Sequence, residues 1–354
     1  MERLKRAEKS KMTSLKLLDL LESNTTMLRS YILDALPKDH SVPEIDLLYK
    51  MMRDYPSRPS KCLRPSLSIL VCETLGGKTE DMMITAAALE IFQNWVLIHD
   101  DIEDQSEFRR GSPVLQKLHG LPLAINAGDA LHAKMWGLLT KNCDVLGDKL
   151  AHLIMEEFVK IVDETTEGQH VELGWIEKNR WDLSEDDYFL LVQKKTSWYT
   201  CVAPCRLGHL VATRKPLSKS DFVRFGIDLG IGFQIRDDVL NLTADRRYGK
   251  EIAGDIVEGK RTLVLINLLE VVGARDRDNV RAIMDKGKNK SHKDVQKVLE
   301  LMKRYGSIEY ARKRAEEFSQ SALKQFEQIF GHVPNAKAKT RLRSLVEFMI
   351  ARDW

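Results

Sequence analysis

A cluster of carboxylates ends an apolar helical stretch in the first third of the chain. Asp100, Asp101 and Asp104 have the spacing Asp-Asp-x-x-Asp, and residues 91–98 before them are mostly apolar. Side chains four apart lie on one face of a helix, so Asp100 and Asp104 are predicted to repel each other unless a cation lies between them. In a buried helix such a cluster is costly without a compensating charge. Mg²⁺ suits the site because it takes carboxylate oxygens and leaves positions for water and phosphate.

The same pattern occurs a second time. The stretch 233–236 is followed by Asp237 and Asp238, and Asn241 stands four positions after Asp237. One acidic run of this kind is more often a solvated helix face, but two in one helical chain indicate a shared task. They could face each other across a bundle and hold several metal ions around one polyanion.

Further short motifs accompany the two clusters. In chain order the matches lie at residues 61–65, 100–104, 108–111, 126–129, 168–169, 195–196, 233–238 and 249–260. With this combination the chain resembles the trans-isoprenyl diphosphate synthases, the family of the farnesyl and geranylgeranyl diphosphate synthases. The resemblance implies Mg²⁺-dependent condensation of isopentenyl diphosphate with an allylic diphosphate in an all-α fold.

The resemblance also implies how the metals are held. About three Mg²⁺ ions are expected per active site. Asp100 and Asp104 would bind two of them from one side, and Asp237 a third from the other. Asp101 and Asp238 would support these ligands.

Cationic and polar side chains are expected around the two substrates. By resemblance, the contacts to the allylic diphosphate are Arg109, Lys195, Lys250 and Lys260. The isopentenyl diphosphate pocket would contain Lys61, Arg64, Gln93 and Arg110. Thr196, Gln234 and the Lys195 carbonyl would surround the allylic cation with oxygen dipoles. No side chain is needed as base, because the released pyrophosphate can take the proton, and His99 is expected to be a packing residue.

Two positions depart from the family pattern. Asn241 stands where many relatives carry a third aspartate, so weaker metal affinity is expected without loss of activity. Pro59 and Ser60 replace the usual Gly-Gly before Lys61, and neither has the conformational freedom of glycine. Close approach of the backbone to isopentenyl diphosphate is therefore restricted at this point.

The residues before Asp100 are expected to set the product length. A helix rises ~1.5 Å per residue, so Val96, Trp95 and Phe92 lie ~6–12 Å from the metals. Trp95 is the largest possible plug at the floor of the tunnel. Of the fourth and fifth positions before Asp100, only the fifth is aromatic, and the first motif has no insertion. This pattern is similar to that of the archaeal type of geranylgeranyl diphosphate synthase. A C20 product is predicted, with C15 (farnesyl) or C25 (geranylfarnesyl) as alternatives.

Two other functions fit these motifs less well. A class I terpene cyclase needs only one diphosphate site, which would leave Lys61, Arg64, Gln93 and Arg110 without a task. A non-catalytic partner subunit typically lacks an aspartate motif, whereas both are essentially present here.

Composition adds few constraints. The 354 residues carry 55 basic and 52 acidic side chains, a balance that gives no argument for nucleic acid binding. Five scattered cysteines predict a reducing, cytoplasmic location. No apolar stretch of about twenty residues is evident, so no transmembrane segment is expected. A homodimer is expected by resemblance.

The elements that must position these residues are predicted to be helices, since no alternating strand pattern is found. A polar leader is expected over residues 1–13 and a single all-α domain over residues 14–354. Helices are predicted at 14–36, 43–52, 63–75, 81–101, 121–140, 149–169, 185–211, 218–242, 262–272, 294–305, 308–329 and 338–350. Loops are predicted at 55–60, 105–113 and 285–291. Segments 105–113 and 243–259 could close over the diphosphates.

Overall fold

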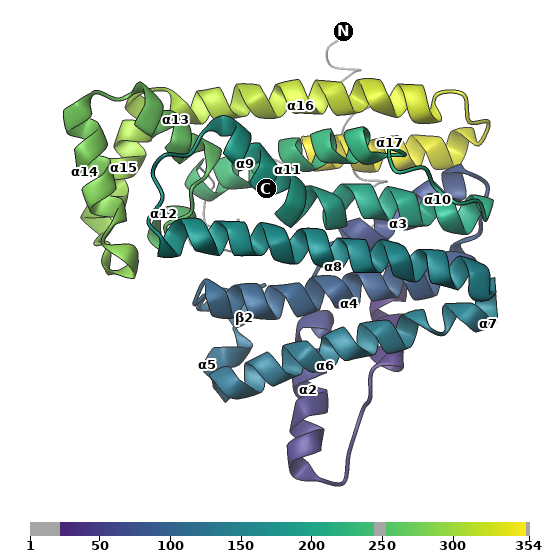
Figure 1. Ribbon diagram of the computed structural model, residues 1–354. Helices are drawn as coiled ribbons and strands as arrows, with labels where there is room; N and C mark the ends of the chain where they lie inside the picture. Colours follow the sequence, from purple (N-terminus) through teal and green to yellow (C-terminus); the bar gives the residue numbers. More distant parts are fainter. Residues whose placement is uncertain (1–21, 244–252, 352–354) are drawn as a thin grey trace, which may run out of the picture. The chain divides into compact units, whose positions relative to one another are not determined.

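The computed structural model describes residues 22–243 and 253–351. Within these ranges the chain is almost entirely helical, so the predicted all-α class is confirmed (Figure 1). The described strands, β1 (Phe108–Arg109) and β2 (Ser112–Pro113), are two residues long. The predicted leader, the start of the first helix and Lys250 lie outside the described residues. The chain forms two compact units, and the single domain over residues 14–354 stays a prediction.

Unit 1 takes residues up to Val159, Ala203–Phe222 and Ile329–Phe348. Its elements are helical residues 22–35, α2 (Pro43–Ser57), α3 (Leu63–Thr74), α4 (Thr79–Glu103), β1, β2, α5 (Leu115–His119), α6 (Leu121–Leu139), α7 (Asn142–Leu146), the start of α8 (Asp148–Glu177), α10 (Ala203–Thr213) and most of α17 (Ala336–Ile350). Helix α4 packs against α2, α3, α6, α7 and α10. It thereby carries the first aspartate cluster from the core of unit 1.

Unit 2 takes Lys160–Val202, Val223–Gln328 and the residues from Met349. Its elements are the rest of α8, α9 (Glu185–Val192), a π-helix (Gln193–Val202), α11 (Val223–Thr243), α12 (Gly254–Glu258), α13 (Leu263–Val271), α14 (Ala274–Met284), a 3₁₀ turn (Gly287–Asn289), α15 (His292–Arg304) and most of α16 (Ser307–Phe330). Ser184 and Ser291 begin α9 and α15 with capping boxes. Helix α11 carries the second aspartate cluster and packs against the π-helix, α9, α12 and α13.

The structure differs from the predicted helices in two main places. The single helix predicted over 185–211 is α9, the π-helix and α10 in succession. Pro204 has no N–H to donate to Thr200, and the π-helix ends two residues before it. Helix α14 was not predicted, because its buried residues Val280, Ile283 and Met284 come only at the end of a highly charged run.

Two predicted loops are partly ordered elements. Helix α2 runs on to Ser57 with Pro56 in its last turn. The segment 105–113 contains the β1–β2 hairpin, in which Phe108 pairs with Pro113 and Arg109 with Ser112.

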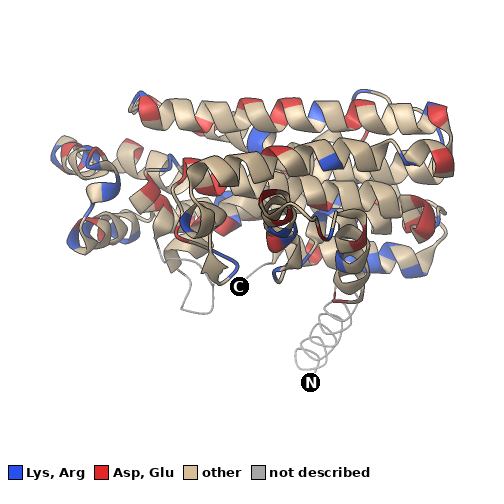
Figure 2. Cartoon of the chain, turned by 90° about the horizontal axis from the view of Figure 1, so that it is seen from below, with Lys and Arg blue, Asp and Glu red and all other residues tan. Residues whose placement is uncertain are grey.

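Acidic and basic side chains are interspersed along the described helices (Figure 2), in line with the balanced composition. By length and composition alone, α4 is the one described helix that could cross a membrane. In its most apolar 18-residue window 78% is buried inside the protein. This burial is typical of a core helix of a folded domain.

Candidate active site

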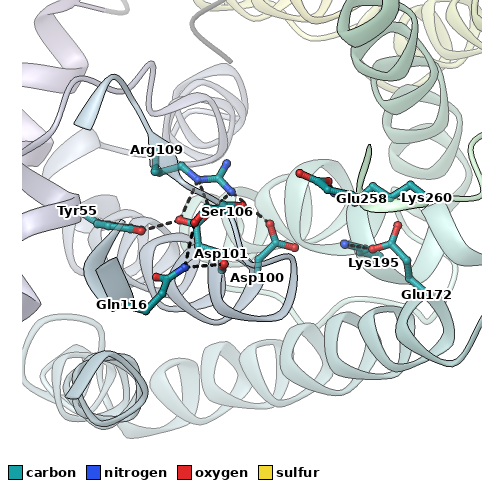
Figure 3. Close-up of polar contacts among 10 residues, drawn as sticks. All are labelled: Tyr55, Asp100, Asp101, Ser106, Arg109, Gln116, Glu172, Lys195, Glu258 and Lys260. Atoms are coloured by element: carbon teal, nitrogen blue, oxygen red, sulfur yellow. Dashed lines mark hydrogen bonds and ion pairs between the residues drawn. The ribbon is translucent and has the colours of Figure 1, made fainter. Parts of the chain in front are cut away.

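The second aspartate of the first cluster is fixed by protein groups. Asp101 is completely buried, and its carboxylate accepts hydrogen bonds from the Tyr55 hydroxyl at 2.6 Å and from Arg109 Nε at 2.9 and 3.1 Å (Figure 3). The Gln116 amide donates to the Asp101 carbonyl at 2.7 Å. Arg109 supplies the positive charge that a buried carboxylate requires. Burial by itself lowers the pKa of Arg109, but Asp101 outweighs it and the net pKa is raised.

Its neighbours in the cluster are placed differently. The Asp100 side chain is 17% exposed, and Arg109 Nη2 lies 3.4 Å from its carboxylate. Asp104 N donates to the Asp100 carbonyl at 2.8 Å, so the helical spacing of the pair is kept to the end of α4. Asp104 is 7% exposed, so Asp100 is the most accessible of the three carboxylates.

The donor set fits Mg²⁺ bound together with a substrate. In the ranges that the structure describes, no three His, Cys, Asp or Glu side chains are grouped so that they could hold a metal ion by themselves. Mg²⁺ is usually bound by one or two carboxylates plus substrate phosphates and water. The carboxylate pair Asp100 and Asp104 matches that mode of binding.

The two adjacent arginines of the hairpin reach different groups. Arg110 and Gly111 form the two-residue turn, with φ of +52° and +78°, and positive φ at both positions is the requirement of a type I′ turn. While Arg109 binds Asp101, Arg110 Nη1 donates to the Tyr55 carbonyl at 2.9 Å and to Asn94 Oδ1 at 3.2 Å.

A buried glutamate lies beside the predicted isopentenyl diphosphate residues. Glu90 is 4% exposed; Arg110 Nη2 is 3.8 Å from its carboxylate, and Ser60 Oγ donates to it at 3.4 Å. Burial raises the pKa of Glu90, while the charges of Arg110 and Arg64 act in the opposite direction. The structure thus brings Arg64 and Arg110 together around one carboxylate.

Two further predicted residues of this pocket also belong to unit 1. Lys61 Nζ lies 5.3 Å from the centroid of the Phe348 ring. Gln93 is 7% exposed, and its Oε1 has no hydrogen-bond partner in the described part of the chain. A buried amide with unused hydrogen-bonding capacity is costly unless a ligand satisfies it.

The second aspartate of the second cluster repeats the arrangement of Asp101. Asp238 is 6% exposed, and its carboxylate accepts hydrogen bonds from the Tyr188 hydroxyl at 2.7 Å and from Gln234 Nε2 at 2.8 Å. Thr196 Oγ1 donates to Gln234 Oε1 at 3.0 Å. Burial raises the pKa of Asp238 to about 7, against the effect of its hydrogen bonds. The preceding Asp237 is half-buried, as Asp100 is.

Asn241 has a structural task of its own. Its side-chain oxygen accepts the backbone N–H of Asp255 at 3.2 Å, and its carbonyl accepts that of Ala253 at 2.7 Å. These bonds join the end of α11 to the start of α12. The amide oxygen is therefore already in use where relatives carry a carboxylate.

The two predicted lysines of unit 2 that the structure describes, Lys195 and Lys260, are each paired with a glutamate. Lys195 binds Glu172 on α8, and Lys260 Nζ lies 2.7 Å from Glu258 Oε2 (Figure 3). Lys195 stands in the π-helix, which crosses α8 at Gly168. A Cβ on Gly168 would lie 2.3 Å from the Lys195 backbone nitrogen, so only glycine permits this approach.

An aromatic stack occupies the predicted tunnel floor. The Trp95 ring stacks on His132 at 4.0 Å between centroids, and Phe92 meets its edge at 5.3 Å. Trp136 Nε1 donates to His132 Nε2 at 3.0 Å. Burial lowers the pKa of His132, which favours the neutral ring that accepts this bond. Val96, one residue after Trp95, is half-buried.

His99 packs between helices. Its Nε2 lies 3.4 Å from Asp129 Oδ1, and a Cβ on Gly128 would come within 2.5 Å of the ring. Close packing of α4 against α6 explains both residues.

Sequence reasoning missed Tyr55, Tyr188, Glu90 and His132. The two tyrosines precede their aspartates by 46 and 50 positions, and no local pattern links such distant residues. Glu90 had one available signal: it is an acidic residue in the middle of an apolar helix.

Two aspartate clusters on helices, each with one buried member that accepts a hydrogen bond from a tyrosine hydroxyl, are the arrangement expected of helical enzymes that act on diphosphates. The family model for polyprenyl synthetases matches residues 45–302, and the chain belongs to this family. The family resemblance deduced from the motifs is thus confirmed.

Individual relatives extend over nearly the whole chain. The short chain isoprenyl diphosphate synthase of Methanothermobacter thermautotrophicus is 32% identical over 297 residues, which are 83% of this chain and 86% of that protein. The geranylgeranyl diphosphate synthase of Sulfolobus acidocaldarius is 32% identical over 337 residues, 94% of this chain and 97% of that protein. The crystal structure of the geranylgeranyl pyrophosphate synthetase of Pyrococcus horikoshii superimposes with a TM-score of 0.82 at 27% identity, covering 96% of this chain and 99% of that one.

Proposed function

We propose that the protein condenses isopentenyl diphosphate head-to-tail with an allylic diphosphate, and that geranylgeranyl diphosphate (C20) is the main product. The observation that carries the proposal is the repeated arrangement of the two clusters. In each, a buried aspartate is bound by a tyrosine hydroxyl, and the aspartate before it, Asp100 or Asp237, is more accessible. Family membership and relatives named for the same reaction support it.

Asp100, Asp104 and Asp237 are proposed to hold Mg²⁺, about three ions per active site. Bound Mg²⁺ would supply Lewis-acid stabilisation of the leaving diphosphate. Asp101 and Asp238 accept hydrogen bonds from Tyr55 and Tyr188. In the proposal these bonds hold the helix ends on which the neighbouring metal ligands stand.

The cationic side chains bind the allylic diphosphate in this proposal. Arg109, Lys195 and Lys260 now contact carboxylates, and phosphate oxygens would compete for the same N–H donors. Each positive charge is therefore already oriented before substrate arrives, which lowers the cost of binding. Lys250 is proposed for the same role.

The carbon chemistry needs a dry, polar-lined space. Once the allylic carbon–oxygen bond breaks, the cation must be kept from water. The Thr196 hydroxyl and the Gln234 carbonyl, which bond each other at 3.0 Å, place oxygen dipoles there in the proposal, together with the Lys195 carbonyl. Isopentenyl diphosphate, held by Lys61, Arg64, Gln93 and Arg110, attacks the cation and loses a proton to the released pyrophosphate.

Assembly and location are proposed on separate grounds. A homodimer is supported by an apolar surface on α5 and α6, where Leu118, Leu121, Leu123 and Ile125 are 39–50% exposed. A cytoplasmic location is supported by the five cysteines, all of which are free thiols.

A Mg²⁺-dependent condensation assay with each allylic primer tests the function. Asp100→Ala and Asp237→Ala should each remove most turnover, whereas Asn241→Asp should change it only mildly. Asp276→Ala, which removes an exposed carboxylate bonded to Tyr305, is the matched control and should keep full activity. Near-full turnover of Asp100→Ala under saturating Mg²⁺ would contradict the metal assignment.

A further inference from the structure

The end of α2 carries an arginine to which no function has been assigned. The side chain of Arg58 is 7% exposed, and its Nε donates to Asp54 Oδ1 at 2.6 Å. Its guanidinium lies 4.5 Å from the centroid of the Tyr55 ring. The group is therefore buried, paired with a carboxylate and stacked on an aromatic face.

The other two nitrogens of Arg58 donate hydrogen bonds to backbone carbonyls of the β1–β2 hairpin. Nη1 donates to the Arg109 carbonyl at 2.8 Å and to the Ser112 carbonyl at 3.3 Å, and Nη2 donates to the Pro113 carbonyl at 2.7 Å. One of these three acceptors lies on β1 and two lie on β2, so Arg58 bonds both sides of the turn. A rigid fork of donors spans them in a way that a lysine ammonium cannot.

The hairpin needs such support. Its strands are only two residues long, and an isolated two-stranded hairpin is marginally stable at best. Arg110 also has a φ of +52°, which an L-residue with a Cβ adopts only when its surroundings enforce it.

Tyr55, three residues before Arg58, joins the same network at two points. Its hydroxyl donates to Asp101, and its carbonyl accepts a hydrogen bond from Arg110. The last turn of α2 therefore contacts the first aspartate cluster and both arginines of the hairpin.

We propose that Arg58 is a positioning residue, which holds the hairpin so that the side chain of Arg109 stays on the aspartate cluster and that of Arg110 on the isopentenyl diphosphate pocket. Arg58 acts through these two residues and does not itself contact a substrate. Arg58 directly precedes Pro59 and Ser60, the two positions where the family usually has Gly-Gly. The kinetic part of the inference rests on the proposed function.

The first test measures the hairpin directly and needs no activity. Arg206 provides a matched control, since it is 6% exposed, pairs with Glu157 and donates to the carbonyls of Ser218 and Asp221. Arg58→Lys should speed amide hydrogen exchange in residues 106–114 at least about tenfold, the effect of one lost charged hydrogen bond. Arg206→Lys should leave exchange in this segment unchanged. Equal exchange of 106–114 in the two variants would overturn the inference.

The second test asks whether the hairpin acts on substrate binding. Arg58→Lys should raise the KM for isopentenyl diphosphate about tenfold with a smaller change in kcat, whereas Arg206→Lys should change neither. Combined with Arg110→Ala, the Arg58→Lys change should add nothing to that KM, because the residue through which it acts is gone. Additive effects would overturn the proposed route through Arg110.

The two tests distinguish failure of the proposed function from failure of the inference about Arg58. If the wild-type protein shows no Mg²⁺-dependent condensation, the proposed function fails, and the exchange experiment still decides whether Arg58 holds the hairpin. If Arg58→Lys does not fold, Asp54→Asn removes the negative charge that pairs with Nε and should speed exchange in 106–114 to a smaller extent. Unchanged exchange in a folded Asp54→Asn variant, with Arg58→Lys unfolded, would count against the inference.

Discussion

Replacing Trp95 by alanine is expected to lengthen the product by one isoprene unit. Phe92 is the next aromatic residue along α4, three positions before Trp95, and this offset corresponds to about 4.5 Å of helix. That depth is close to the length that one five-carbon unit adds to an extended prenyl chain. The tail should therefore extend to Phe92, and the main product should change from C20 to C25.

The stability cost follows from the surroundings of the same ring. Truncation of a fully buried tryptophan costs about 3–5 kcal/mol. Trp95 is only half-buried, although it is stacked on His132 and packed on Phe92, so a loss of about 2 kcal/mol in the free energy of unfolding is expected. Trp95→Phe, which retains an aromatic ring, should keep most of the C20 product.

Chromatography of the dephosphorylated products is the assay, with urea unfolding to show that each variant is folded. Phe158→Leu serves as the control, because Phe158 is a buried aromatic of α8 and is not one of the predicted chain-length residues. It should lower stability without changing product length. An unchanged length distribution in folded Trp95→Ala would refute Trp95 as the floor.

Three other outcomes are expected. Arg64→Ala should mainly raise the KM for isopentenyl diphosphate, whereas Lys195→Ala should also lower kcat with the allylic substrate; equal effects on both substrates would argue against separate pockets. Gly168→Ala should lower kcat at least about tenfold, because its Cβ would push the Lys195 backbone, which it would approach to 2.3 Å; wild-type kcat would show that the crossing can relax. Burial, helped by the charge of Arg261, lowers the pKa of Lys290 to about 8. The unfolded chain then binds more protons than the folded one between pH 8 and its ordinary pKa, so stability should rise with pH in that window. Lys290→Gln should reduce this slope in urea unfolding, and an identical slope would contradict the assignment.

Local sequence was sufficient for the helical fold and for the two aspartate clusters. Apolar residues at helical spacing predicted α4 and α11, because helix amphipathicity is a property of neighbouring residues. The spacing of Asp100, Asp101 and Asp104 predicted a metal and diphosphate chemistry from local sequence as well, and the metal role stays a prediction. The predictions were wrong where the local signal was weak, as in the charged helix α14. They were also wrong where the hydrogen-bond pattern changes within a helical stretch, as in the π-helix.

Tertiary structure decided which aspartate of each cluster is buried and which is accessible. Asp100 and Asp101 are chemically identical neighbours in the sequence, yet Asp101 is completely buried and Asp100 is not. The difference comes from Tyr55, 46 positions away, and from the turn of a helix that points adjacent side chains in different directions.

Sequence by itself therefore determined which residue types are present, their helical spacing and the family to which the chain belongs. Only the tertiary structure showed that Asn241 accepts hydrogen bonds from the backbone at the start of α12, that buried Glu90 lies near Arg110, and that Arg58 bonds the carbonyls of the hairpin. These contacts join residues that are distant along the chain, and no local propensity encodes them. They form because burial leaves each polar group only the partners that the packed core places within hydrogen-bond distance.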